Sequence, residues 1–231
     1  MDWNDPETAT VFPGFREAGY EPEALINFLS LLGWNPGNDE EVMDMNRLTE
    51  LFSLDRIGSA GAKFDIDKLT WFNETYIRHS EPKALLPQAK KALKAAGIDL
   101  PGDEFLTGMI RLMRERVKFA RDFATEAPYF FAPPAAYDEK MVKKWTAESA
   151  VLLQALAEKF DSLADWTDEN LHHAFQELLT QKETGAGKVM APLRLALTGT
   201  SSGPGVFEIA ALLGKTETLK RIHTAVETIE V

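Results

Sequence analysis

The sequence contains no cysteine, no long apolar run and no complete catalytic motif, and each absence excludes a class of protein. Without cysteine the chain forms no disulfide, offers no thiolate nucleophile and holds no cysteine-bound zinc. No run approaches the roughly 18 apolar residues of a membrane-spanning helix. The acidic start, MDWNDPETATVF, lacks the basic segment and apolar stretch of a secretory signal. We therefore expect a cytoplasmic protein that does not bind membranes.

The net charge of −11 is unevenly distributed over the 231 residues. Residues 1–60 carry 12 acidic residues against three basic ones, a net charge of −9. Residues 109–122 and 181–223 each carry a net charge of +3 instead. Because salt screens charges beyond roughly 8 Å, an acidic protein can still bind a polyanion at a locally basic surface. Such stretches are more often plain solvated helix faces, so charge alone leaves both interpretations open.

The glycine-rich stretch GAGKVMAPLRLALTGTSSGPGVFEIAALLGKT, residues 185–216, ends in GKT as a phosphate-binding P-loop does. A P-loop needs a glycine five residues before the glycine of GKT, but Ile209 stands there, inside an apolar run typical of a helix. The dinucleotide fingerprint fails as well, because Met190 occupies the place of its third glycine. The stretch therefore predicts no nucleotide site.

The remaining polar residues form no catalytic or metal-binding set. His172 and His173 are adjacent, so on a helix they point about 100° apart. Glu169 and His172 have the i, i+3 spacing of a di-metal site, but no second such pair exists. No serine lies in a G-x-S-x-G elbow. We expect neither a catalytic residue nor a metal site.

Apolar residues recur at helical spacing along almost the whole chain, which predicts an all-α fold with no strand series. Asp65 and Thr167 are the expected N-caps of two of the helices. The aromatic and proline-rich segment 128–137 is interpreted as a hinge between helical subdomains. The expected helical ranges are 21–34, one or two short helices after residue 39, 65–79, 80–97 with a kink or new start at Pro87, 102–127 as one long helix or a pair, 138–163, 166–182, and a helix that begins near residue 206.

Five stretches together, in this order and spacing, resemble the C-terminal half of bacterial glutamyl-tRNA synthetase, a class I aminoacyl-tRNA synthetase. Any one of them is a weak match, but the five in order cover nearly the whole chain. They are FREAGYEPEALINFLSLLGWNPG (15–37), KFDIDKLTWFNETYIR (63–78), MRERVKFARDFATEAPYFF (113–131), WTDENLHHAF (166–175) and GKVMAPLRLALTGTSSGPGVFEIAALLGKTETLKRI (187–222).

The family's HIGH-type and KMSKS-type motifs are absent, so we interpret the chain as a fragment that follows the ATP-binding Rossmann half. The resemblance implies a stem-contact domain over 1–79 and an α-helical anticodon-binding domain with subdomains 80–133 and 134–231. The fragment alone is expected to be inactive and to need no cofactor. Its parent, a glutamate–tRNA ligase, would use ATP and Mg²⁺. The expected partner is tRNA(Glu) and not DNA, bound by a monomer.

The resemblance also implies residue roles. Arg116 matches an arginine that discriminates the third anticodon base, and Arg194 matches a second anticodon-contacting arginine. A guanidinium suits this role because its rigid fork of donors can pair with the edge of an unstacked base. The loop residues Pro204, Gly205 and Val206 match backbone that approaches anticodon bases, although some members have proline at the position of Gly205 and a larger aliphatic residue at that of Val206. Possible phosphate contacts are Arg111, Lys118, Lys188 and Lys215.

Each of these roles has a structural alternative. Arg116 could pair with Glu115 or Asp122, and Arg194 could cap a helix C-terminus. The four phosphate candidates could equally be solvated surface residues. Three aromatic residues are expected in the core rather than stacked on bases: Phe130, Phe131 and Trp166. The competing function is a free-standing helical protein-interaction module, with the acidic first 60 residues as its partner surface.

Overall fold

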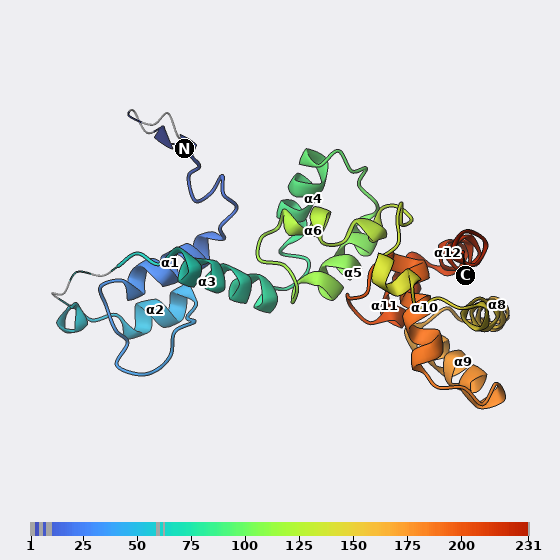
Figure 1. Ribbon diagram of the computed structural model, residues 1–231. Coiled ribbons are helices and arrows are strands. Elements are labelled where there is room, and N and C mark those ends of the chain that lie inside the picture. The colour runs from blue at the N-terminus through green and yellow to red at the C-terminus, as the bar shows by residue number, and fades with distance from the viewer. Residues whose placement is uncertain (1–2, 5–6, 8–10, 59–60, 62, 231) are drawn as a thin grey trace. The chain divides into compact units, whose positions relative to one another are not determined.

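The computed structural model describes residues 3–4, 7, 11–58, 61 and 63–230, and these are mostly helical, as expected (Figure 1). The chain forms two units that interleave along the sequence. Unit 1 consists of Met1–Leu100 and Arg114–Glu126, and unit 2 of Pro101–Met113 and Ala127–Val231. The functional boundaries proposed at residues 79 and 133 remain predictions. No helix of the described residues is both long and apolar enough to cross a membrane.

Unit 1 is built around the packing of α1 on α3, whose buried faces meet through Ala24, Phe28, Leu69 and Phe72. Asp65 caps α3 as predicted, because its side chain accepts hydrogen bonds from the amides of residues 67 and 68. A short antiparallel pair of two-residue strands, β1 and β2, was not expected from the sequence. The elements of unit 1 are β1 (Trp3–Asn4), β2 (Val11–Phe12), α1 (Pro22–Leu31), α2 (Met45–Leu51), η1 (Leu54–Arg56), α3 (Ile66–His79), α4 (Leu86–Ala95) and α6 (Asp122–Thr125).

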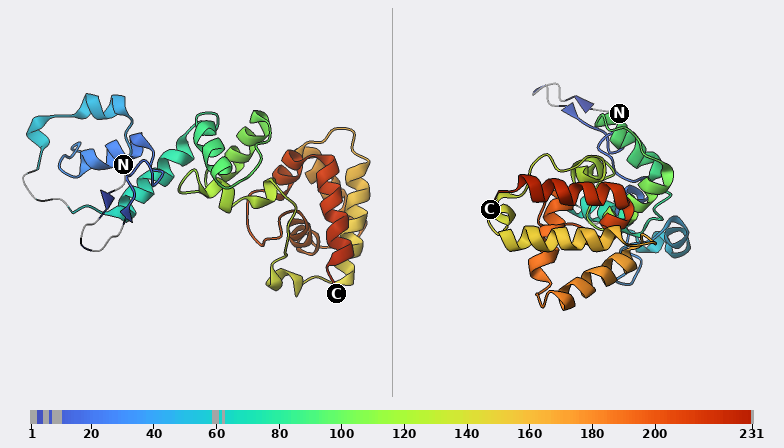
Figure 2. Two further views of the ribbon diagram at one scale, coloured as in Figure 1. Left: turned by 90° about the horizontal axis from the view of Figure 1, so that it is seen from above. Right: turned by 90° about the vertical axis from the view of Figure 1, so that its right-hand side faces the viewer.

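Unit 2 is a helical bundle in which α8, α10 and α12 pack on one another (Figure 2) and share a hydrophobic core. Its fully buried side chains include Leu153, Phe160, Phe175 and Leu193. Thr167 caps α9 through the amide of Asn170, as predicted. The elements of unit 2 are α5 (Asp103–Met113), η2 (Pro128–Phe130), α7 (Glu139–Val142), α8 (Ala147–Asp161), α9 (Asp168–Gln181), α10 (Gly187–Thr198), α11 (Val206–Leu213) and α12 (Lys215–Thr228).

The expected helix or helix pair over 102–127 is shorter and more broken than the periodicity suggested. Helix α5 ends at Met113, and only the short α6 follows, from Asp122 to Thr125. Between them the chain runs in turns, because the Asp122 carboxylate accepts hydrogen bonds from the amides of Lys118 and Phe119, at 2.9 Å each. Arg116 therefore lies on a turn segment and not on a helix.

Candidate nucleic-acid interface

Residues 114–121 of unit 1 include two of the predicted contact residues, Arg116 and Lys118. Both side chains are exposed, whereas the intervening Val117 is 1% exposed. The buried side chains of Val117 and Phe119 anchor the segment within unit 1. The two cations are thus presented to solvent from a rigid turn, which lowers the entropy lost when they bind a ligand.

The buried amide of Asn73, on α3, holds this segment directly. Its Nδ2 donates to the Lys118 carbonyl at 2.5 Å, and its Oδ1 accepts from the Glu21 amide at 2.7 Å. Glu21 in turn accepts a hydrogen bond from Gln88 at 3.1 Å. Burial raises the pKa of the Glu21 carboxyl, which the bond from Gln88 partly opposes. One side chain thus joins the start of α1, helix α3 and the Arg116 segment.

Replacing Asn73 by alanine should lower the free energy of unfolding by about 2 kcal/mol, because the partly buried Lys118 carbonyl and Glu21 amide lose the fully buried side chain that bonds both of them. Asn38→Ala is the matched control, since Asn38 is exposed and its side chain bonds with its near neighbour Glu40. Urea unfolding of both variants checks this. Equal, small losses for the two variants would mean that Asn73 does not hold the segment.

Two other arginines of this basic stretch make contacts that hold unit 1 together. Arg114 donates to the Ser80 carbonyl at 2.7 Å. Arg121 lies over the Phe119 ring at 3.9 Å and bonds to the Ala18 carbonyl. Both arginines keep their positive charge, but some of their donors are already used by these carbonyls and are not offered to a phosphate.

The glycine-rich stretch of unit 2 forms the end of α10, a loop and the start of α11. Gly199 ends α10 with φ of 72°, and a Cβ there would lie 2.6 Å from the Ala136 carbonyl, so only glycine fits. Ile209 lies inside α11, which confirms that residues 206–213 are not the P-loop that GKT suggested. At the start of α11 the Glu208 carboxylate accepts a hydrogen bond from the Gly205 amide at 3.1 Å, which caps the helix where the loop ends.

The three predicted loop residues differ in what they can offer to a base. The side chains of Pro204 and Val206 are buried, Val206 at 3% exposure within the core of unit 2. Gly205 between them is exposed. Any approach of a base to this loop would therefore be to the backbone around Gly205, as the resemblance implied, and not to the Val206 side chain.

Arg194 and this loop lie together within unit 2. A Cβ built on Gly203, where φ is 148°, would be 3.2 Å from Arg194 Nη1 and 3.4 Å from the Tyr129 hydroxyl. The half-buried guanidinium therefore packs against the loop backbone, beside an aromatic hydroxyl. Tyr129 is 4% exposed and its hydroxyl donates to Met113 Sδ at 3.5 Å, so it supports the loop from within unit 2. The half-buried arginine and the exposed backbone at Gly205 are the parts suited to meet an unstacked base.

Gly203→Ala should lower the free energy of unfolding by about 1–3 kcal/mol, because the new methyl group meets Arg194 and the backbone conformation is strained for any other residue. Gly185→Ala is the control: nothing lies within 4 Å of a Cβ there. Thermal unfolding compares them. If Gly203→Ala is as harmless as Gly185→Ala, the close packing of Arg194 on the loop is wrong.

Arg221 of α12 is a buried cation that the sequence reasoning counted as surface charge. It is 3% exposed, and Nη1 donates to the Leu197 carbonyl at 2.8 Å and to the Tyr129 carbonyl at 2.6 Å. Its Nε donates to Glu217 at 2.7 Å. Arg221 therefore fixes the C-terminal end of α10, three residues after Arg194, relative to η2.

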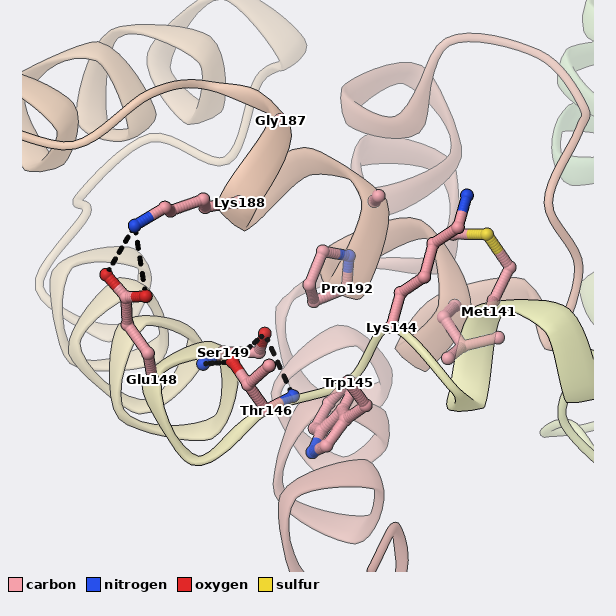
Figure 3. Close-up of a pocket in the computed structure, with 11 residues that line it drawn as sticks. Met141, Lys144, Trp145, Thr146, Glu148, Ser149, Gly187, Lys188 and Pro192 are labelled. Carbon is pink, nitrogen blue, oxygen red and sulfur yellow. Dashed lines mark hydrogen bonds and ion pairs between the residues drawn. The ribbon is translucent and has the colours of Figure 1, made fainter. Parts of the chain in front are cut away.

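The four predicted phosphate contacts divide between the units. Arg111 is an exposed residue at the end of α5 in unit 2, and Lys118 belongs to unit 1. Lys188 pairs with Glu148 at 3.0 Å at the rim of a pocket between α8 and α10 (Figure 3). Lys215 pairs with Asp161 at 3.1 Å. A phosphate would have to compete with a carboxylate at both lysines, which weakens them as contacts relative to Arg111 and Lys118.

Of the three aromatic residues expected in the core, one is buried and two are half-buried. Phe130 is 4% exposed. Phe131 and Trp166 are half-buried, and Trp166 donates to the Ala210 carbonyl at 3.0 Å, which ties it to the bundle. Within the described part of the chain, no group of three or more histidine, aspartate or glutamate side chains could hold a metal ion.

Two protein families match this sequence. Residues 77–226 match the anticodon binding domain family, and residues 8–71 match the catalytic domain of class I tRNA synthetases (E and Q). The chain therefore belongs to the family of synthetase anticodon-binding domains. Arg116, Arg194 and the loop around Gly205 all lie inside the first match.

The relatives are, in particular, glutamate–tRNA ligases, which confirms the resemblance. The enzyme of Phocaeicola vulgatus is 42% identical over 231 residues, which are 100% of this chain and 46% of that enzyme. That of Porphyromonas gingivalis is 40% identical, over 99% of this chain and 45% of the enzyme. The crystal structure of a glutamate tRNA ligase from Elizabethkingia meningosepticum superposes with a TM-score of 0.91 at 38% identity, over 100% of this chain and 46% of that one. This chain thus spans about half the length of the relatives it matches.

Proposed function

We propose that this chain binds tRNA(Glu) and reads its anticodon as the C-terminal part of a glutamate–tRNA ligase. The observation that carries the proposal is the match of residues 77–226 to the anticodon binding domain family, with both candidate base-reading arginines inside it. In support, each arginine is attached to a frame held by a buried side chain: Asn73 for the Arg116 segment and Arg221 for the end of α10. Arginines fixed in this way can select a base by geometry.

Within the whole ligase, this part would contribute binding energy far from the reacting atoms. The remaining part would activate glutamate with ATP and Mg²⁺, and contacts at the anticodon would help to place the 3′ end of the tRNA. No step of that chemistry is assigned to residues of this chain, which by itself should neither bind ATP nor charge tRNA. We further propose that the protein is cytoplasmic and acts as a monomer.

Filter binding of glutamate tRNA at two salt concentrations tests the proposal. If about four cations neutralise phosphates, the affinity should fall on the order of 10- to 100-fold between about 50 and 200 mM salt. Phosphate contacts orient the RNA, whereas Arg116 and Arg194 should act on the choice of anticodon. Absence of binding at the lower salt concentration would contradict the proposal and favour a protein-interaction module instead.

A further inference from the structure

Helix α4 of unit 1 carries a basic surface that lies outside the five stretches resembling the synthetase family. Residues 82–98 contain four lysines and no acidic residue, a net charge of +4. On α4 the lysines at 90, 91 and 94 have the i, i+3 and i, i+4 spacing of neighbours on one helix face. The opposite face is buried through Ala89 and Leu93. The lysines are therefore directed away from the core that α4 helps to form.

Three of the four lysines are exposed and have no partner among the described residues. They are Lys91, Lys94 and Lys83, which lies in the turn before α4. We call these three residues the lysine patch. The C-terminal end of the helix dipole accounts for a lysine at 94, in the last turn of α4, but not for the other two. Other lysines of the chain do pair with carboxylates, namely those at 68, 159, 188 and 215.

A series of hydrogen bonds joins α4 to the turn that carries Arg116. Gln88 of α4 donates to the Glu21 carboxylate at 3.1 Å, and the Glu21 amide donates to Asn73 at 2.7 Å. Asn73 donates in turn to the Lys118 carbonyl. Helix α4 also packs on α6, which follows this turn (Figure 1). The lysine patch and Arg116 thus belong to one framework within unit 1.

The surroundings of the lysine patch suit a polyanion better than a protein. Among the described residues from 72 to 150, no large apolar side chain is exposed. The centre of a protein–protein interface is usually enriched in aromatic residues and depleted in lysine. A phosphate backbone needs no apolar contact and is attracted by a cluster of unpaired cations.

We propose that the lysine patch binds phosphates of the base-paired stem that adjoins the anticodon loop. This inference rests on the proposed function and adds to it a contact outside the anticodon. A lysine ammonium is a compact point charge that suits a phosphate, whereas it lacks the rigid fork with which an arginine reads a base. Base-paired RNA is recognised mostly through its backbone and shape, and phosphate contacts orient it without choosing a sequence. The patch would hold the stem while Arg116 reads the loop.

Filter binding of an anticodon stem-loop tests the patch by comparing Lys91→Gln/Lys94→Gln with the control Lys63→Gln/Lys68→Gln. Both variants lower the charge of unit 1 by two, but the control lysines lie before and within α3. The patch variant should bind about tenfold more weakly at the lower salt concentration. Its salt slope, the fall of log affinity with log salt concentration, should be smaller by about two. The preference for the third anticodon base should persist, and the control should change the affinity by less than about twofold.

Two further measurements locate the contact. Ethylation of the stem phosphates should weaken binding of the unaltered chain but have little further effect on the patch variant. Lys91→Arg/Lys94→Arg keeps both positive charges and should bind the stem-loop as the unaltered chain does.

The outcomes separate this inference from the proposed function. If the unaltered chain binds the stem-loop with a base preference while the patch variant and the control have equal affinities and salt slopes, the patch is not an RNA contact and the proposed function stands. Absence of binding by the unaltered chain would contradict the proposed function itself. A dimer that sedimentation detects in the unaltered chain but not in the patch variant, with the salt slope unchanged, would assign the patch to the acidic residues of a second copy and reject the RNA contact.

Discussion

Replacing Arg116 by glutamine should leave this chain able to bind glutamate tRNA but weaken its preference for the cognate third anticodon base by roughly ten- to 100-fold. Arg116 is exposed on a turn whose backbone is held by Asn73 and Asp122, and these hydrogen bonds are made by the Lys118 backbone and not by the Arg116 side chain. Glutamine keeps a polar side chain but loses the rigid fork and the positive charge of the guanidinium. The measurement is the ratio of affinities for tRNAs with cytosine or guanine at that base.

Lys118→Gln is the matched control, two residues away on the same exposed turn. If Lys118 contacts a phosphate, its loss should weaken binding to both tRNAs equally and reduce the salt slope by about one. The two variants therefore separate base reading from charge. Equal losses on both tRNAs for Arg116→Gln would place that arginine among the phosphate contacts and contradict its reading role.

Arg221→Met should cost about 3 kcal/mol of the free energy of unfolding of unit 2, because the Leu197 and Tyr129 carbonyls lose their buried donor and Glu217 loses its cation. Methionine retains much of the volume, so the effect would come from lost hydrogen bonds rather than from a cavity. Urea unfolding followed by circular dichroism, together with hydrogen exchange at the end of α10, measures the loss.

Lys220→Met removes the neighbouring charge from an exposed position of the same helix and should change the free energy of unfolding by less than about 0.5 kcal/mol. The comparison thus cancels any general effect of lowering the charge of α12. A similar, small loss for both variants would show that Arg221 does not hold the end of α10 in place.

The local features of the fold were predictable because short-range chemistry determines them. Asp65 and Thr167 cap their helices through amides two and three residues away, and the apolar run around Ile209 does form a helix. The end of α5 at Met113 was not predictable. The apolar spacing continues past it. The turn is held locally by the Asp122 carboxylate and also by the Asn73 bond to the Lys118 carbonyl, 45 residues away in the sequence, which no local pattern indicates.

The candidate site likewise has residues that could be found from local sequence motifs and residues whose role depends on long-range contacts. Arg116 and Arg194 were found through sequence motifs that resemble the family, and their base-reading roles remain predictions. The supporting residue Arg221 was counted as surface charge, because its partner Tyr129 lies 92 residues away. The −9 charge of residues 1–60 was visible in the sequence, but a groove lined by Ile26, Met45 and Phe52 required the packing of α2 on α1.

The most direct test of anticodon reading is the affinity of the unaltered chain for two anticodon stem-loops that differ only at the third anticodon base. Both RNAs have the same number of phosphates, so their affinities should fall in parallel as salt is raised, while the ratio between them persists. We predict a preference of roughly tenfold or more for the cognate base at both salt concentrations. Equal affinities for the two stem-loops would contradict the account.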